Sequence, residues 1–180
     1  RFVEKISEFL RDRSIRRVRH LAKTGIHSIV YDQSWAGMGF SPKQFREFML
    51  PYDKPVVTAA KKAGLLVSYH NCGSGQSFIE DMASTGADSL ETLTPKESSG
   101  DFDLVESKRR VGNQITLNGG FNERILGEAT AEQIRDQVKK CIDSAATGGR
   151  YVLRTTGQIF DFSPGNIEVF TQAAREYGRY

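Results

Sequence analysis

The chain has 180 residues, of which 38% are apolar and 17 are glycine, so its composition is that of one globular domain. Lys and Arg total 25 against 22 Asp and Glu, and the net charge of +3 excludes an acidic disordered tail and a polycation for nucleic acid. The sequence contains no apolar run long enough to predict a membrane helix and no signal-peptide pattern. Its two cysteines are too few for a disulfide framework, so we expect a cytoplasmic protein.

Two hydrophobic periodicities alternate along the chain, one typical of helices and the other of strands. The predicted strands are short β-rich runs, at Ile26–Tyr31, Leu65–Tyr69, Asp88–Thr92, Gln114–Leu117 and Tyr151–Arg154. The predicted helices are Phe2–Ala22, Ser41–Gly64 with interruptions at Pro51 and Pro55, Gln76–Ser84, Asp101–Arg110, Ala131–Ala146 and Pro164–Tyr177. Five β-then-α units result, with no linker between them, and a single domain over 1–180 is expected.

This alternation predicts a parallel sheet covered by helices. A doubly wound nucleotide-binding sheet is disfavoured because Gly73-Ser74-Gly75 lacks a third glycine at position 78, which is Phe78. A closed (β/α)8 TIM barrel needs eight units, so five are too few. We therefore predict an α/β fold that is part of a (β/α)8 barrel. The chain opens on Arg1 within a helical pattern, which favours a fragment whose missing strands lie outside this numbering.

Polar or ionisable residues end every predicted strand, where parallel folds place their active sites. They are Asp32, His70, Cys72, Glu91, Asn118 and Arg154. We expect these groups to converge on one rim, although each alone is also compatible with a simple loop cap. Trp35, in the glycine-containing loop after the first strand, is either a wall of the substrate site or part of a packed loop.

His70 and Cys72 form an H-x-C pair at one strand end, and imidazole and thiolate are preferred zinc donors. A catalytic zinc takes three protein ligands, so a third donor must come from elsewhere. Cys141 lies within a predicted helix and is expected in the core, whereas Glu91 and Asp32 end neighbouring strands. The alternatives are that Cys72 is a core residue beside a hydrogen-bonded His70, and that Glu91 caps its loop or pairs with an arginine.

Several segments resemble the uroporphyrinogen decarboxylase superfamily in order and approximate spacing. They are Tyr31–Gly37, Ser41–Phe45, Leu50–Tyr52, Tyr69–Gly73, Gly86–Asp88, Leu117–Phe121 and Pro164–Ile167. The resemblance runs from about Leu21 to the end of the chain. It implies a (β/α)8 barrel of which this chain holds the later strands, without the N-terminal part that carries an arginine-bearing substrate segment.

The resemblance implies two possible activities. Uroporphyrinogen decarboxylase removes acetate carboxyl groups without a cofactor in porphyrin biosynthesis, whereas the corrinoid-dependent methyltransferases bind zinc through His, Cys and a later Cys. His70 and Cys72 match the first two zinc ligands, but Gly157 stands near the later one. The histidine typical of the decarboxylases near that place is also missing, so neither branch matches fully.

The sequence therefore predicts an enzyme, and the first hypothesis is a methyltransferase. In this hypothesis a zinc ion bound by His70, Cys72 and Glu91 activates a thiol that accepts the methyl group. A corrinoid is the expected co-substrate, and a corrinoid protein is the expected partner. Glu91 is preferred over Asp32 as third ligand because its side chain is longer and the resemblance gives Asp32 a catalytic, substrate-facing role. The alternatives are cofactor-free decarboxylation of a carboxylated ring, or an inactive fragment. Expected substrate contacts are Tyr31, Trp35, Asn118 and Gly120. Unpaired sheet edges also favour self-association or a missing N-terminal segment.

Overall fold

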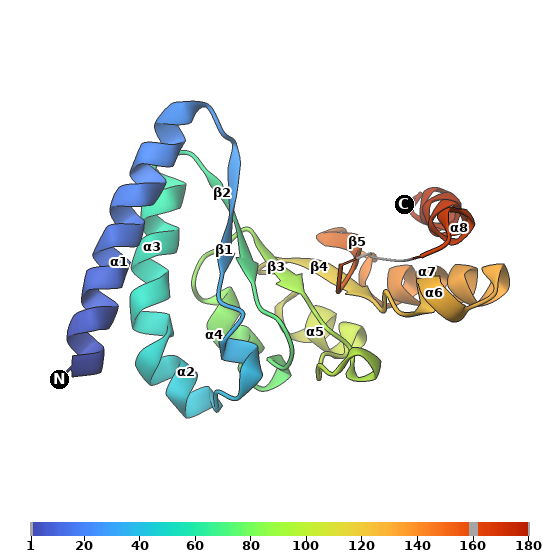
Figure 1. Ribbon diagram of the computed structural model, residues 1–180, viewed down its shortest axis with the longest axis horizontal. Helices are drawn as coiled ribbons and strands as arrows, with labels where there is room; N and C mark the ends of the chain where they lie inside the picture. The colour runs from blue at the N-terminus through green and yellow to red at the C-terminus, as the bar shows by residue number, and fades with distance from the viewer. Residues whose placement is uncertain (1, 159–161, 180) are drawn as a thin grey trace.

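In the computed structural model, which describes residues 2–158 and 162–179, five parallel strands form one sheet (Figure 1). The strands are β1 Ser28–Asp32, β2 Leu66–His70, β3 Ser89–Thr92, β4 Thr116–Phe121 and β5 Tyr151–Thr155. They pair in chain order, so each strand is hydrogen-bonded to its neighbours in sequence. Within the described residues β1 and β5 are the two edges and do not pair with each other. The prediction of a partial α/β barrel with five parallel units is confirmed.

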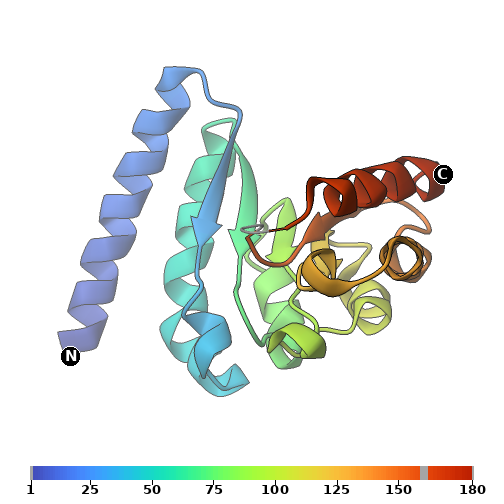
Figure 2. The same ribbon diagram turned by 45° about the vertical axis from the view of Figure 1, so that its right-hand side comes forward.

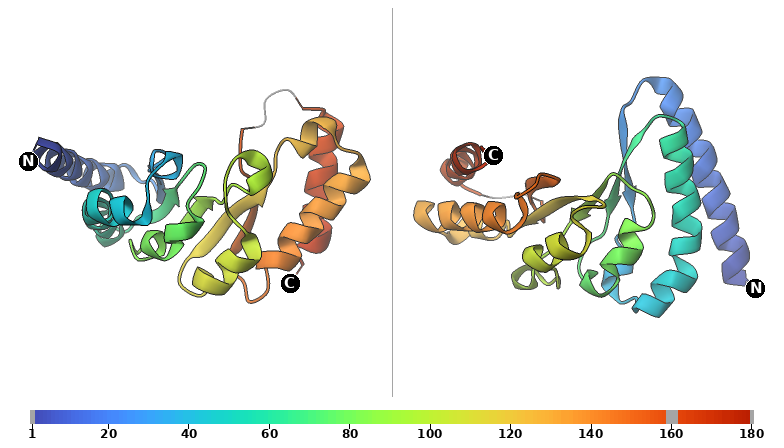
Figure 3. Two further views of the ribbon diagram at one scale, coloured as in Figure 1. Left: turned by 90° about the horizontal axis from the view of Figure 1, so that it is seen from below. Right: turned by 180° about the vertical axis from the view of Figure 1, so that it is seen from behind.

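Eight helices are present in the described residues, namely α1 Phe2–Leu21, α2 Pro42–Phe48, α3 Leu50–Lys62, α4 Ile79–Ala83, α5 Leu104–Val111, α6 Ile125–Glu128, α7 Ala131–Ala145 and α8 Pro164–Tyr177. Helices α3, α4, α5 and α7 lie on one face of the sheet, α1 runs along α3, and α8 packs against α7 (Figures 2 and 3). Short 3-10 turns at Ala22–Thr24, Ala36–Met38, Gln76–Phe78 and Lys96–Ser98 complete the connections. No helix in these ranges is both long and apolar enough to span a bilayer.

Local signals explain where the helices begin. Ser41, where the second predicted helix begins, caps α2 through a capping box with Gln44. The predicted interruption at Pro51 falls where α2 ends and α3 begins, and Pro51 lies in the first turn of α3, where its missing N–H costs nothing. The predicted interruption at Pro55 is wrong, because Pro55 lies inside α3. The predicted start of α5 at Asp101 is wrong, because the Asp103 carboxylate accepts the Glu106 N–H at 3.0 Å and so caps a helix that begins at Leu104. Helix α6 was not predicted, since four residues are too few for a periodic pattern.

The two faces of the sheet differ in burial. Strand residues that face the helices are buried, among them Val67, Tyr69, Leu90, Leu117 and Tyr151. On the opposite face, Val30, Leu66 and Val152 are 60%, 59% and 48% exposed. Because side chains alternate between the faces of a strand, every second residue of each strand lies on this helix-free face, including Asp32, His70 and Glu91 of the predicted rim. We call it the open face, and it is the surface that would line the interior of a complete barrel.

Candidate active site on the open face

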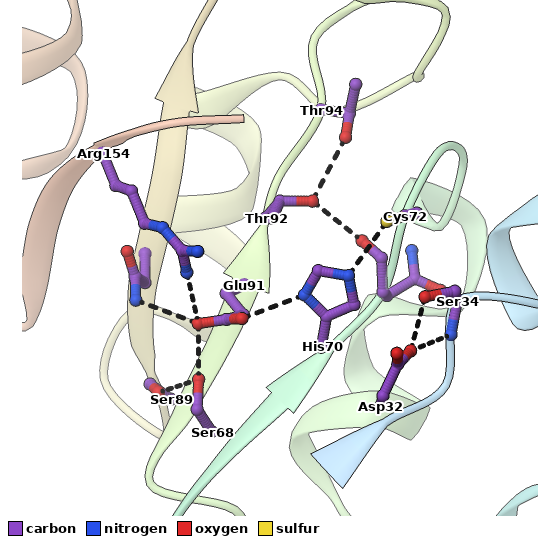
Figure 4. A network of polar contacts seen from close by, with 12 residues as sticks. Asp32, Ser34, Ser68, His70, Cys72, Ser89, Glu91, Thr92, Thr94 and Arg154 are labelled. Carbon is purple, nitrogen blue, oxygen red and sulfur yellow. Dashed lines mark hydrogen bonds and ion pairs between the residues drawn. The ribbon is translucent and has the colours of Figure 1, made fainter. Parts of the chain in front are cut away.

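Four of the predicted rim residues form a row across four neighbouring strands. The strand register pairs Asp32 with His70, His70 with Glu91, and Glu91 with Asn118. Arg154 lies on β5 two residues beyond the partner of Asn118 and reaches back to the row. Figure 4 shows Arg154, Glu91, His70 and Asp32 following one another across the strands. Hence the expected convergence at the carboxyl ends is confirmed, with alternating positive and negative groups along the row.

Glu91 is the centre of this row and is only 4% exposed. One carboxylate oxygen accepts the Nδ1 hydrogen of His70 at 2.9 Å. The other accepts hydrogen bonds from the side chains of Ser68 at 2.9 Å, Arg154 at 2.6 Å and Asn118 at 3.4 Å. The hydrogen bond from His70 is the main cause that lowers the pKa of Glu91, followed by Ser68 and the Arg154 charge. Glu91 is therefore a fixed anion that organises the cations on either side of it.

His70 lies between two hydrogen-bond partners that occupy opposite edges of its ring. Nδ1 faces Glu91, and Nε2 faces the sulfur of Cys72 at 2.9 Å. The Glu91 hydrogen bond raises the pKa of His70 from 6.5 to about 9, against the opposing effect of partial burial. At neutral pH the ring is thus an imidazolium, with its charge directed toward Cys72 and the adjacent Asp32.

Asp32 is an exposed carboxylate at the end of β1. Its Oδ1 accepts the backbone N–H of Ser34 at 2.8 Å and also the Ser34 hydroxyl. The hydrogen bond from the Ser34 side chain lowers the pKa of Asp32, so the group is ionised at neutral pH. Asp32 and His70 therefore present an anion and a cation side by side on the open face.

Two of the predicted substrate contacts, Tyr31 and Gly120, are directed away from the open face in the structure. Tyr31 precedes Asp32 on the same strand and so points to the other face, where its hydroxyl donates to Asp53 at 2.9 Å. A Cβ atom at Gly120 would lie 2.4 Å from a methyl carbon of Leu104 on α5, so this position also faces the helix layer. Its carbonyl oxygen accepts from Cys141, which is 2% exposed and lies in the core as predicted.

The arrangement around His70 does not fit Glu91 as a third zinc ligand beside Cys72. Its carboxylate binds Nδ1 of His70, whereas Cys72 lies at Nε2, so Glu91 and Cys72 are on opposite sides of the imidazole. Across residues 2–158 and 162–179, no three His, Cys, Asp or Glu side chains are grouped to hold a metal ion. A zinc site with three protein ligands therefore does not fit the arrangement of His70, Cys72 and Glu91.

The remaining predicted contacts, Asn118 and Trp35, lie at the edges of the row. Asn118 Oδ1 is buried and lacks a hydrogen-bond partner among the described residues. Trp35 is 73% exposed in the loop after β1. Gly37 holds that loop against the loop after β2, because its carbonyl accepts the Ser74 N–H at 3.0 Å and a Cβ there would lie 1.6 Å from the Cys72 carbonyl oxygen. The Trp35 loop is thus docked beside the His70–Cys72 pair.

One buried group near the site escaped prediction. Asp53 on α3 is 2% exposed and accepts hydrogen bonds from Tyr31, Gln33 and Tyr69. Burial raises the pKa of Asp53 to about 6, although the three hydrogen bonds oppose that rise. The helical periodicity of α3 predicts that Asp53 is buried, because Asp53 falls on the same helical face as the buried Val56, Val57 and Ala60.

A parallel α/β sheet with its ionisable residues at the carboxyl ends of the strands is the arrangement typical of barrel enzymes. The family model of uroporphyrinogen decarboxylase (URO-D) matches residues 1–177 of the chain. The chain therefore belongs to the uroporphyrinogen decarboxylase family.

Curated relatives that match the chain are themselves named uroporphyrinogen decarboxylase. The one from Pseudoalteromonas translucida (strain TAC 125) is 29% identical over 164 residues, covering 86% of this chain and 43% of its own length. Another, from Trichodesmium erythraeum (strain IMS101), is 28% identical over 161 residues, covering 88% of this chain and 43% of the relative. The chain thus spans less than half the length of these relatives.

Proposed function

We propose that the open face contributes to a decarboxylase site for a carboxylated ring, of the kind named in the relatives. The juxtaposition of the Asp32 anion with the His70 cation is the observation that carries this proposal. Removal of CO2 from an acetate group on an electron-rich ring requires a protonated ring to accept the electron pair of the breaking C–C bond. A proton must then be added to the carbon that has lost the carboxyl group.

Each residue of the row supplies one part of that chemistry. The Asp32 carboxylate lies where it can stabilise the positive charge of the protonated ring, because its own negative charge is fixed by Ser34. The His70 imidazolium provides a proton donor at Nε2, and Glu91 holds the ring in that orientation. Arg154, whose side chain is 47% exposed, offers the guanidinium edge that does not contact Glu91 to a substrate carboxylate.

The exposed indole of Trp35 supports the proposal that the substrate is a planar ring. The indole is exposed on the loop that Gly37 docks beside the His70–Cys72 pair, and aromatic faces bind planar rings by stacking. Trp35 is also the only tryptophan of the chain, so its fluorescence reports directly on a bound ring.

Zinc-assisted methyl transfer from a corrinoid to a thiol is the second candidate. The specific observation in its favour is the contact between His70 Nε2 and the Cys72 sulfur at 2.9 Å. Against it stand the wrongly placed third donor and the decarboxylase names of the relatives. We therefore rank decarboxylation first.

Product analysis separates the two candidates. The intact protein is incubated anaerobically with uroporphyrinogen, in the presence of a chelator, and the products are resolved by chromatography and mass. We expect stepwise loss of CO2, which Asp32→Asn slows by about 100- to 1,000-fold and the surface variant Asp12→Asn leaves unchanged. In parallel, the protein is offered methylcobalamin and a thiol. Methylated thiol that depends on added zinc, with no CO2 released from uroporphyrinogen, would reverse the ranking.

A further inference from the structure

Asp53 occupies an unusual place for a carboxylate. It lies in the first turn of α3, is 2% exposed, and faces the sheet from the helix layer. Burial of a charged group is unfavourable unless it is hydrogen-bonded, and Asp53 has such partners. Its Oδ1 accepts from the Tyr31 hydroxyl at 2.9 Å and from Gln33 Nε2 at 2.7 Å, and its Oδ2 accepts from the Tyr69 hydroxyl at 2.6 Å.

The three donors are the immediate sequence neighbours of the two ionised residues on the open face. Tyr31 and Gln33 flank Asp32, and Tyr69 precedes His70. Because adjacent residues of a strand point to opposite faces, Tyr31 and Tyr69 point toward Asp53 while Asp32 and His70 point away from it. The Asp53 carboxylate is thereby hydrogen-bonded to the side chains of the residues on both sides of Asp32 and of the residue directly before His70.

Packing alone does not require a charged group at this position. The neighbouring side chains on the same helical face, Val56, Val57 and Ala60, are apolar and at most 1% exposed. An apolar residue of similar volume would avoid the cost of desolvating a carboxylate. The contribution of Asp53 is therefore the position in which its hydrogen bonds hold neighbouring side chains, not the burial of apolar surface. Short bonds to both strands restrict how far β1 can move relative to β2 at their carboxyl ends.

We propose that Asp53 is a positioning residue that fixes the location of Asp32 relative to His70 by anchoring Tyr31, Gln33 and Tyr69. Asp53 itself contacts neither ionised group and lies outside the open face. That this geometry serves catalysis rests on the proposed decarboxylation. The geometric coupling itself does not depend on which reaction the protein performs.

Asp53→Asn tests the proposal with little change in volume. In the intact protein we expect kcat for decarboxylation to fall by about 100-fold, the effect of a small misplacement of reacting groups, while KM changes by less than about threefold. Asp88→Asn is the matched control. Asp88 accepts the Val67 N–H at 2.8 Å and so binds β2 at the opposite end of the strand. This control should lose stability without a change in kcat.

A spectroscopic measurement tests the coupling without activity. The chain has three histidines, and in Asp53→Asn we expect the imidazole nitrogen resonances of His70 to shift while those of His20 and His27 remain in place. If Asp53→Asn does not fold, Tyr69→Phe and Tyr31→Phe each remove one anchor and should give the same changes in smaller size. A folded variant with an unchanged His70 spectrum overturns the proposal. If the wild type releases no CO2, the proposed function fails, and the His70 spectrum alone still decides the role of Asp53.

Discussion

Glu91 accepts the Nδ1 hydrogen of His70 at 2.9 Å and thereby turns Nε2 toward Cys72, 2.9 Å away. This relationship converts two strand-end residues of neighbouring strands into an oriented imidazolium. Because Glu91 and Cys72 contact opposite edges of the ring, Glu91 orients His70 and does not lie beside Cys72, where both could bind one metal ion.

Glu91→Gln should remove this orientation. The neutral amide cannot stabilise the imidazolium, so we expect the pKa of His70 to fall toward 6.5, as measured by NMR titration. Since Ser68 and Arg154 lose the same anion, the free energy of unfolding should fall by about 1.5–3 kcal/mol. The exposed pair of Glu106 and Arg109 provides the control, because Glu106→Gln should leave both quantities nearly unchanged. An unaltered His70 pKa in Glu91→Gln would contradict the assigned hydrogen bond.

Stability should depend on pH through His70. Its pKa is raised to about 9 in the folded chain, so its charged contacts contribute fully below the unfolded pKa of 6.5. That contribution is lost as the pH rises through about 9. We expect urea unfolding of the wild type and of His70→Asn to differ more at pH about 6 than at pH about 10. A difference that grows with pH would show that His70 is held neutral.

Asp53 should produce a second pH effect at lower pH. Its folded pKa of about 6 lies above the usual 3.8, so its contribution to stability is fully present below 3.8 and is lost as the pH rises through 6. The wild type should therefore lose up to about 3 kcal/mol relative to Asp53→Asn between pH about 4 and 7. Paired urea titrations of the two proteins measure this difference. A constant difference across that range would indicate a carboxylate with an ordinary pKa.

Gly37→Ala should dislodge the Trp35 loop. The added Cβ would lie 1.6 Å from the Cys72 carbonyl oxygen, so the two loops must separate. We expect a loss of about 1–3 kcal/mol in unfolding free energy and a shift of the Trp35 emission maximum. Gly165→Ala in α8 serves as the control, because an added Cβ there would lie 3.7 Å from the Ser163 hydroxyl oxygen, an ordinary van der Waals contact. It should neither lower the unfolding free energy nor shift the Trp35 emission. Unchanged emission in a folded Gly37→Ala protein would mean that the loops are not docked.

Much of the rim was predictable because it depends on strand position alone. Asp32, His70 and Glu91 each end a β-rich run, and parallel pairing brings such ends to one edge, as the register confirms. Tyr31 was placed on the wrong face, although alternation along the strand predicts that neighbours of Asp32 point away from it.

Other features depend on tertiary geometry that no local pattern contains. The side of the His70 ring that Glu91 contacts is set by side-chain rotamers and by the Ser68 and Arg154 partners. Gly120 faces the helix layer with a φ of 88°, a backbone conformation that alternation along a regular strand does not predict. Asp53 contacts residues that lie 16 to 22 positions away, so only folding reveals its partners.

The central claim is that Asp32 on the open face stabilises a positively charged ring during loss of CO2. The most direct measurement is the rate of CO2 release from uroporphyrinogen at saturating substrate, compared between the intact wild type and Asp32→Asn. Loss of a preorganised charge predicts a fall in kcat of about 100- to 1,000-fold. Substrate binding, measured by the change in Trp35 fluorescence, should be retained. An Asp32→Asn protein that releases CO2 at the wild-type rate would contradict the account.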